Sequence, residues 1–326
     1  MTEQPSKHEV RVKPWVVGID LGATKIRLGL VSPQDAIVAA RQIPTNATEG
    51  ANAVVERIVT EVDALAGDLP SDSRIAAVGI CSPGPVDHVS GMLLDPPNLQ
   101  GLHHTPLRDL LAARLSLPVV IEHDAKAAAL GDYYFGAGRG ARDMIFIVVG
   151  TGVGAAMIFA GKLFRGAHNS AGEIGHTTID HEGEPCHCGS RGCVETFMSG
   201  PSLARHYRQA RATAGQPVGE ITGGEVAQAA AGGDPVAVEV MQQAGRALGA
   251  AVATLAMITD VDLYVIGGSV AKAGDLLLAP AREAAPGYSF ASVSSRIRIL
   301  PTALHDDGPL LGCAWLARQN LPPASA

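Results

Sequence analysis

The chain has 326 residues, which suggests two domains at about 150 residues each. Hydrophobic residues make up 47% and charged residues 17%, so the chain is not disordered, and with only 4% aromatic residues large stacking platforms for bases are not expected. The formal net charge of −7 argues against a nucleic-acid partner, because nucleic-acid binding requires clustered lysine and arginine.

The N-terminal residues up to Trp15 are polar and mixed in charge, without the apolar stretch of a signal peptide. Residues 144–161 run for 18 positions without a charge, a length that can indicate a membrane-spanning helix. Gly150, Gly152 and Gly154 would break such a helix, so we interpret this segment as two strands around a glycine turn. We therefore expect a cytoplasmic protein with no membrane partner.

The first half of the chain alternates apolar strand patterns with helical ones. In chain order we predict strands at 15–19, 26–31 and 36–39, a helix at 53–66, a strand at 75–80, a helix at 107–115, a strand at 119–121 and a helix at 125–135.

The second half continues this alternation around an irregular stretch rich in glycine, histidine and cysteine. In chain order we predict strands at 144–149 and 155–159, the irregular stretch at 166–193, a helix from 235 to about 258, a strand at 263–266, a helix at 274–285, a strand at 297–300 and a helix at 310–319. Asp234 followed by proline predicts the start of the long helix.

The first glycine turn (residues 20–25) is a candidate phosphate site. Gly22, Ala23, Thr24 and Lys25 can present backbone N–H groups and a hydroxyl to phosphate, and Asp20 before them is placed to hold Mg²⁺. An ordinary hairpin turn with a solvated aspartate is the alternative.

Two further glycine turns follow predicted strands. Their candidate residues are Gly150, Thr151, Gly152 and Gly154 in the second glycine turn (150–154) and Gly267 and Gly268 in the third (267–268). The second turn also matches a dinucleotide-binding fingerprint, but that motif requires a helix where 155–159 reads as a strand. The third turn suits a nucleotide, although a tight strand-to-helix turn is the simpler reading. No Walker motif is present.

The sequence also contains a candidate metal site. Its ligands would be three closely spaced cysteines and an upstream histidine, namely Cys186, Cys188, Cys193 and His176. Three thiolates and one imidazole form a ligand set typical of structural Zn²⁺, and His181 and His187 are rival fourth ligands. We interpret Cys81 and Cys313 as thiols in or near the core.

Four polar residues are candidates for catalysis or substrate binding. Asp124 follows a buried strand, where a carboxylate can accept a proton from a hydroxyl, or it simply caps the helix that follows. Glu173, Glu195 and Asn98 would suit hydrogen bonding to a polyol, although surface positions are the default for such residues.

The order of these motifs resembles that of the ROK family of bacterial sugar kinases, and most closely its zinc-containing glucokinases. The resemblance covers nearly the whole chain and rests on 18–25, 82–87, 97–99, Asp124, 150–154, 171–176, 186–195 and 266–268. It implies an α/β protein with the two-lobed actin/hexokinase-like ATPase fold, in which ribonuclease H-like domains are duplicated around a central ligand cleft.

The resemblance also implies a domain division. It predicts a tail at 1–14, a small lobe at 15–122 completed by a C-terminal helix at about 309–326, and a large lobe at 123–308 carrying the zinc motif and an adenosine-binding turn. A homodimer or homotetramer is expected.

The implied activity is ATP-dependent phosphorylation of a hexose at its 6-hydroxyl, with glucose as the expected sugar and Asp124 as general base. The implied sugar contacts are Asn98, His123, Asp124, Glu173, His176 and Glu195. Asp20 and the glycine turns would hold Mg²⁺ and the nucleotide, and a structural zinc ion would share His176 with the sugar site.

The chain departs from the family at His123 and Lys126, where Asn is common and the first Asn often touches the sugar. Other sugars therefore remain alternatives, namely fructose, mannose, N-acetylglucosamine, N-acetylmannosamine or a cyclitol. A sugar-responsive regulator is disfavoured, because only 14 residues precede the first strand and the charge is wrong for DNA.

Overall fold

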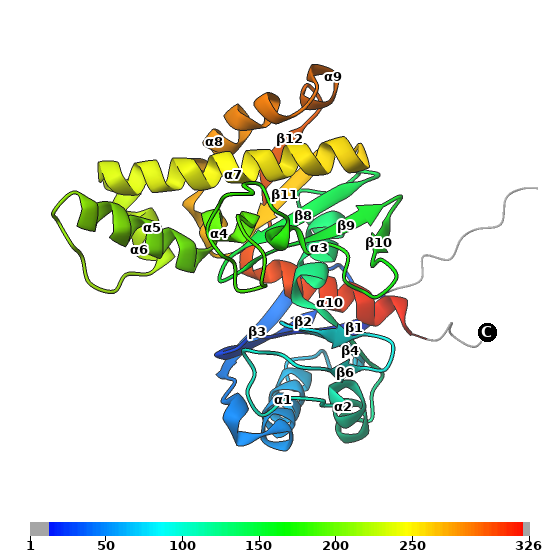
Figure 1. Cartoon of the computed structure of the whole chain (residues 1–326). Helices are drawn as coiled ribbons and strands as arrows, with labels where there is room; N and C mark the ends of the chain where they lie inside the picture. Colours follow the sequence, from blue (N-terminus) through cyan, green and yellow to red (C-terminus); the bar gives the residue numbers. More distant parts are fainter. Residues whose placement is uncertain (1–12, 322–326) are drawn as a thin grey trace, which may run out of the picture. The chain divides into compact units, whose positions relative to one another are not determined.

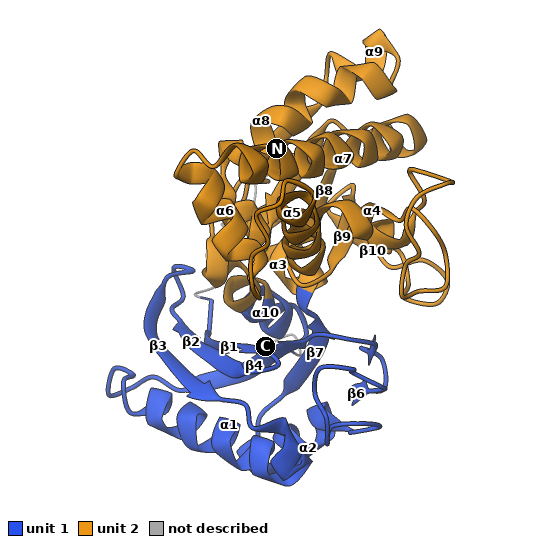
Figure 2. Ribbon diagram, turned by 60° about the vertical axis from the view of Figure 1, so that its left-hand side comes forward, with its two compact units in different colours: residues 1–124, 313–326 blue, residues 125–312 orange. Residues whose placement is uncertain are grey.

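The computed structural model describes residues 13–321, and the chain divides into two compact units. The first comprises residues 1–124 and 313–326, and the second comprises residues 125–312 (Figure 2). The predicted tail, apart from its last two residues, and the end of the predicted C-terminal helix lie outside the described residues. No helix within 13–321 is both long and apolar enough to cross a membrane.

The first unit is built on a five-stranded sheet. It contains the strands β1 (Trp15–Leu21), β2 (Lys25–Val31), β3 (Ile37–Pro44), β4 (Ile75–Ser82), β5 (Val86–Asp87), β6 (Met92–Leu93) and β7 (Val119–His123), the helices α1 (Ala51–Ala66) and α2 (Leu107–Leu115), and the 3-10 helix η1 (Ala47–Glu49).

The second unit is built on another five-stranded sheet. It contains the strands β8 (Met144–Val149), β9 (Val153–Phe159), β10 (Lys162–Phe164), β11 (Leu263–Gly267) and β12 (Arg298–Pro301), the helices α3 (Asp124–Phe135), α4 (Val194–Met198), α5 (Gly200–Thr213), α6 (Gly223–Ala231), α7 (Pro235–Thr259), α8 (Asp275–Ala284) and α9 (Ala291–Ser294), and the 3-10 helices η2 (Ile174–His176), η3 (Val270–Ala273), η4 (Ala285–Tyr288) and η5 (His305–Asp307). Helix α10 (Gly308–Gln319) contributes to both units.

The two main sheets have the same topology. The first has the order β3-β2-β1-β4-β7 and the second the order β10-β9-β8-β11-β12. In each sheet the first three strands are antiparallel and the next two are parallel additions. This repetition agrees with the predicted α/β class and its duplicated domains. The uncharged stretch at 144–161 is the hairpin β8–β9, as predicted.

Each unit has its own hydrophobic core. In the first unit, α1 and α2 lie on one face of the sheet, and residues 313–319 of α10 lie on the other (Figure 1). In the second unit, the long helix α7 packs on the sheet through a row of buried small and aliphatic side chains. Because the strands pack inside these layers, their ends are the positions from which turns reach the surface.

Capping residues explain where the helices of the second unit begin. Asp234 accepts hydrogen bonds from Val236 N at 2.9 Å and Ala237 N at 3.1 Å, which confirms it as the N-cap of α7. The helices α5 and α6 are absent from the sequence-based prediction. Their starts are signalled by Ser199 as an N-cap before a proline and by a capping box between Thr222 and Glu225.

Asp132 on α3 is a buried carboxylate that organises a loop of the second unit. Its carboxylate accepts hydrogen bonds from Ala303 N at 3.1 Å, from Ala137 N at 3.2 Å and from the Thr302 hydroxyl. Replacing Asp132 with Ala leaves these buried donors unsatisfied, and we expect the free energy of unfolding to fall by about 3 kcal/mol or more. Urea unfolding measures this, with the exposed Asp275→Ala as a control expected to change little.

Candidate active site and metal cluster

The first glycine turn joins β1 to β2 as a tight hairpin. Gly22 N donates to Lys25 O at 3.0 Å and closes the turn. Thr45 supports it, because its backbone N donates to Thr24 O at 3.0 Å and its hydroxyl donates to Gly22 O at 2.7 Å. The tip of the turn is exposed, as contact with a phosphate group requires.

Two carboxylates lie at the carboxyl edge of the first sheet. Burial, and secondarily the charge of Asp124, raise the pKa of Asp20 to about 6. The Cys81 thiol donates to Asp20 Oδ1 at 3.6 Å. Two strands away, where β7 leads into α3, His123 Nδ1 lies 3.2 Å from Asp124 Oδ1, and the Asp124 side chain is 41% exposed. Asp124 is therefore accessible to a hydroxyl group, as a general base must be.

The raised pKa of Asp20 predicts an unusual pH dependence of stability. The carboxyl binds its proton more tightly in the folded chain than in the unfolded one, so the free energy of unfolding should fall as pH rises from the ordinary value of 3.8 to about 6. Asp20→Asn should therefore stabilise the substrate-free protein above pH 6, by about 1 to 3 kcal/mol, and have less effect below pH 4.

Denaturant unfolding of the wild type and of Asp20→Asn at pH 4 and pH 8 measures this difference. Asp63→Asn, an exposed position on α1, is the matched control. An Asp20→Asn variant that is less stable than the wild type at pH 8 would contradict the prediction.

The second and third glycine turns lie side by side in the second unit. Gly150 N donates to Gly152 O at 2.9 Å within the second turn. In the third turn Gly268 has φ +95°, and a Cβ there would lie 2.4 Å from Val149 O at the end of β8. Only glycine allows both the backbone conformation and this close approach. The parallel pairing of β8 with β11 thus brings together two turns that are far apart in the sequence.

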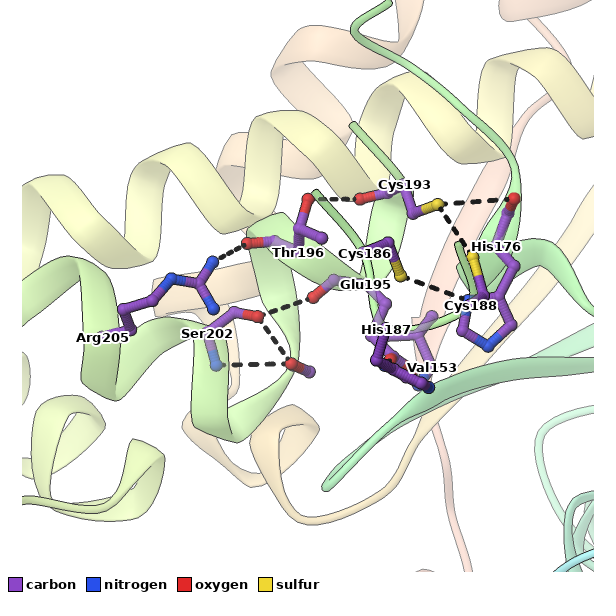
Figure 3. Close-up of polar contacts among 11 residues, drawn as sticks. Val153, His176, Cys186, His187, Cys188, Cys193, Glu195, Thr196, Ser202 and Arg205 are labelled. Atoms are coloured by element: carbon purple, nitrogen blue, oxygen red, sulfur yellow. Dashed lines mark hydrogen bonds and ion pairs between the residues drawn. The ribbon is translucent and has the colours of Figure 1, made fainter. Parts of the chain in front are cut away.

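The predicted metal ligands form a compact Cys/His cluster. One atom from each of four residues lies within 4.8 Å of every other, and these residues are His176, Cys186, Cys188 and Cys193 (Figure 3). The Cys186 Sγ to His176 Nδ1 and Cys188 Sγ to Cys193 Sγ distances are both 3.7 Å. With zinc–sulfur bonds of about 2.3 Å, tetrahedral coordination places sulfur atoms about 3.8 Å apart.

The chemistry of the donors also fits Zn²⁺. All three cysteines are free, so the cluster contains no disulfide. Burial raises the pKa of Cys193 to about 12, so this thiol needs a neighbouring cation to become a thiolate. A hydrogen bond with the backbone of Ser190 lowers the pKa of Cys188. The donor set and the spacing are those of a structural zinc site.

Backbone hydrogen bonds hold the cysteines and the histidine together. Cys186 N donates to Ser190 O at 2.8 Å, which folds the loop between the cysteines. Val194 N donates to Thr177 O at 3.0 Å, which places the last cysteine beside the residue after His176. The cluster therefore depends on hydrogen bonds between segments that are distant in the sequence, and the spacing of the cysteines does not predict these bonds.

The rival histidines lie outside the Cys/His cluster. His181 is exposed, and its Nε2 lies 3.7 Å from Glu182 Oε1. His187 Nδ1 lies 3.3 Å from Glu195 Oε1, and His187, Glu195 and His176 make a second group of nearby ligand atoms. This second group has only three residues, and one of them is His176. The group with four ligand atoms is the one that combines His176 with the three cysteines.

The remaining predicted residues are divided between the units. Asn98 is exposed in the loop after β6 and belongs to the first unit with Asp20, His123 and Asp124. The second unit carries the Cys/His cluster, the other two glycine turns, Glu173 and Glu195. Glu173 is exposed immediately before η2.

The structure assigns Lys126 a contact that the sequence did not reveal. The side chain is buried on α3, and its Nζ donates to both Asn169 O and Asn169 Oδ1 at 2.7 Å. Asn169 has φ +59° and lies in the loop that leads to Glu173. The departure from the family at Lys126 was visible in the sequence, but its partner was not.

Comparison with known proteins identifies the family. The sequence matches the ROK family over residues 16–320. The chain belongs to the ROK family. The glucokinase of Halalkalibacterium halodurans is 35% identical, covering 94% of this chain and 96% of that protein.

Family members with different functions have similar sequence identity to this chain. A solved ROK family glucokinase from Streptomyces griseus, in complex with glucose and AMPPNP, is 34% identical with a TM-score of 0.80, covering 94% of this chain and all of that one. The xylose repressor of Caldicellulosiruptor bescii is 31% identical over 91% of this chain and 76% of its own length. The ROK fold is therefore shared by relatives with different functions, and the site residues must decide between them.

Proposed function

We propose that this chain is an ATP-dependent glucokinase that transfers the γ-phosphoryl group of ATP to the 6-hydroxyl of glucose. The observation that carries the proposal is the full-length similarity to the Streptomyces griseus ROK glucokinase, whose structure contains glucose and AMPPNP. An accessible Asp124 directly after β7 supports a catalytic member of the family over a sugar-binding regulator.

In this proposal Asp124 is the general base. Its carboxylate would accept the proton of the sugar hydroxyl as the hydroxyl oxygen attacks the γ-phosphorus. His123 Nδ1, 3.2 Å from Asp124 Oδ1, would help to orient the carboxylate. Phosphoryl transfer depends mainly on positioning and on stabilisation of charge, so the orientation of this group matters for the rate.

The proposed sugar contacts are polar side chains that can exchange hydrogen bonds with hydroxyl groups. They are Asn98 and His123 with Asp124 on the first unit, and Glu173, His176 and Glu195 on the second. Because His176 Nδ1 faces Cys186, its other ring nitrogen remains to serve a sugar hydroxyl.

The three glycine turns would hold the nucleotide. The proposed contacts are Asp20, Gly22, Ala23, Thr24 and Lys25 in the first turn, Gly150, Thr151, Gly152 and Gly154 in the second, and Gly267 and Gly268 in the third. Mg²⁺ bound with the nucleotide would neutralise charge on the phosphates. Asp20 has the oxygen ligands that Mg²⁺ prefers, and a nearby divalent cation would favour its ionised form.

The Cys/His cluster would hold a structural Zn²⁺ ion. Three thiolates and the His176 imidazole would complete a tetrahedral site with no open position, which is typical of structural zinc. Such an ion would set the orientation of His176 and thereby connect metal binding to sugar recognition. The lobe boundaries and the homodimer or homotetramer expected from the resemblance stay predictions, and light scattering measures the oligomeric state.

An assay that couples ADP formation to NADH oxidation, run over a panel of hexoses, amino sugars and cyclitols with ATP and Mg²⁺, tests the proposal. Glucose is expected to give the highest kcat/KM. The other sugars belong in the panel because His123 stands at a position where the family commonly has Asn. Sugar binding without turnover on any member of the panel would overturn the kinase assignment.

A further inference from the structure

The Glu195 carboxylate contacts two separate segments of the second unit. Its Oε2 atom accepts a hydrogen bond from Val153 N, in the second glycine turn, at 2.8 Å. Its Oε1 atom lies 3.3 Å from Nδ1 of His187, which stands between Cys186 and Cys188. Only 12% of the Glu195 side chain is exposed, and its hydrogen bond with Val153 N is buried, whereas the His187 side chain is 75% exposed (Figure 3).

The backbone of Glu195 is also anchored. Its carbonyl oxygen accepts hydrogen bonds from the Ser202 hydroxyl at 2.9 Å and from Ser199 N at 3.1 Å, at the start of α5. Cys193 of the Cys/His cluster lies two residues earlier in the chain. These hydrogen bonds hold the backbone from which the Glu195 side chain extends to the second glycine turn.

The contact with the second glycine turn is close. A Cβ atom on Gly152 would lie 2.9 Å from Glu195 Oε2, so a larger residue at that position would displace the carboxylate from the turn. Gly150, two residues earlier, is also held, because Gly200 N donates to Gly150 O at 2.8 Å. The turn is thus held at both ends by residues of the α4–α5 region, and the Glu195 contact is its only charged one among those the structure describes.

We propose that Glu195 is a positioning residue for the second glycine turn, so that one carboxylate supports nucleotide binding as well as sugar binding. This inference rests on the proposed function, in which that turn binds phosphate. The physical reason is that a turn presents its N–H groups to phosphate only in one backbone conformation, and a charge-assisted hydrogen bond from Val153 N to a shielded carboxylate stabilises this conformation.

The test measures nucleotide binding in the absence of sugar. Calorimetry with Mg²⁺ and AMPPNP on the full chain should give a dissociation constant about tenfold higher for Glu195→Ala than for the wild type. Glu195→Gln retains a carbonyl oxygen that can accept from Val153 N, so its dissociation constant should stay within about threefold of wild type. Glu182→Ala, which removes an exposed carboxylate in the loop before α4, should bind AMPPNP like the wild type.

A second variant changes the other residue of this contact, Gly152. Gly152→Ala places a methyl group against Glu195 Oε2 and should also weaken AMPPNP binding. If the two residues act through one contact, the effects of Gly152→Ala and Glu195→Ala will not add in the double variant. Zinc content and the melting temperature should stay at the wild-type values in Glu195→Gln, which separates positioning from damage to the cluster.

Kinetics distinguish the inference from the proposed function. Glu195→Ala should raise KM for both ATP and glucose, whereas Glu173→Ala should raise KM for glucose alone. Unchanged AMPPNP affinity in a folded Glu195→Ala protein would overturn the positioning role, even if the wild type phosphorylates glucose. A wild type that binds AMPPNP but phosphorylates no sugar would contradict the proposed function, while weaker AMPPNP binding by Glu195→Ala would still support the inference.

Discussion

Replacing Asp124 with Asn is expected to lower kcat for glucose phosphorylation by about 100- to 10,000-fold, the usual contribution of a positioned general base. Asn has nearly the same shape and can keep the contact with His123, but it cannot accept the proton of the sugar hydroxyl. The dissociation constant for glucose should change by no more than a few-fold. The coupled assay gives kcat, and calorimetry gives sugar affinity.

The matched control for Asp124→Asn is Asp63→Asn, which makes the same chemical change at an exposed position on α1 of the same unit. This control should retain wild-type kcat. Turnover by Asp124→Asn within a factor of three of wild type would remove Asp124 from the role of base. A large loss of glucose affinity with unchanged kcat would instead make Asp124 a binding residue.

The second large effect is expected from Cys188→Ser. Cys188 is exposed, so the substitution costs little packing, and any loss of stability reports mainly on the metal site. We expect the purified wild type to contain one zinc ion per chain and the variant to contain little. Loss of a structural ion costs several kcal/mol, which should lower the melting temperature by about 10 °C.

Metal analysis and thermal melts with and without a chelator measure both effects. A chelator should lower the melting temperature of the wild type toward that of Cys188→Ser and leave the variant unchanged. Cys81→Ser removes a thiol outside the Cys/His cluster and should keep its zinc. A wild type that is metal-free and unaffected by chelators would refute the zinc site.

The glycine turns and the strands around them could be predicted because their signals are local. Asp20 and Gly22 stand between two apolar runs, and β1 and β2 form the expected hairpin. The same reasoning correctly predicted β8 and β9 in the uncharged stretch at 144–161. Turn residues and apolar runs specify such hairpins without help from the rest of the chain.

The helices α5 and α6 were missed because their apolar patterns are weak. Both carry many polar or small residues on their exposed sides and bury only a few side chains. β3 was predicted too short for a related reason, since half-buried and exposed residues alternate along it and give no continuous apolar run. In such elements packing against the rest of the unit, and not local preference, decides the structure.

By itself, the sequence determined the α/β class, the glycine turns, the metal-ligand candidates and Asp124 as the candidate base. These depend on residue type and spacing within short segments. Only the tertiary structure decided that His176, and not His181 or His187, completes the set with three cysteines, and that Glu195 contacts the second glycine turn. Such contacts join residues that are distant in the chain, and the pairing of strands and the packing of loops bring them together.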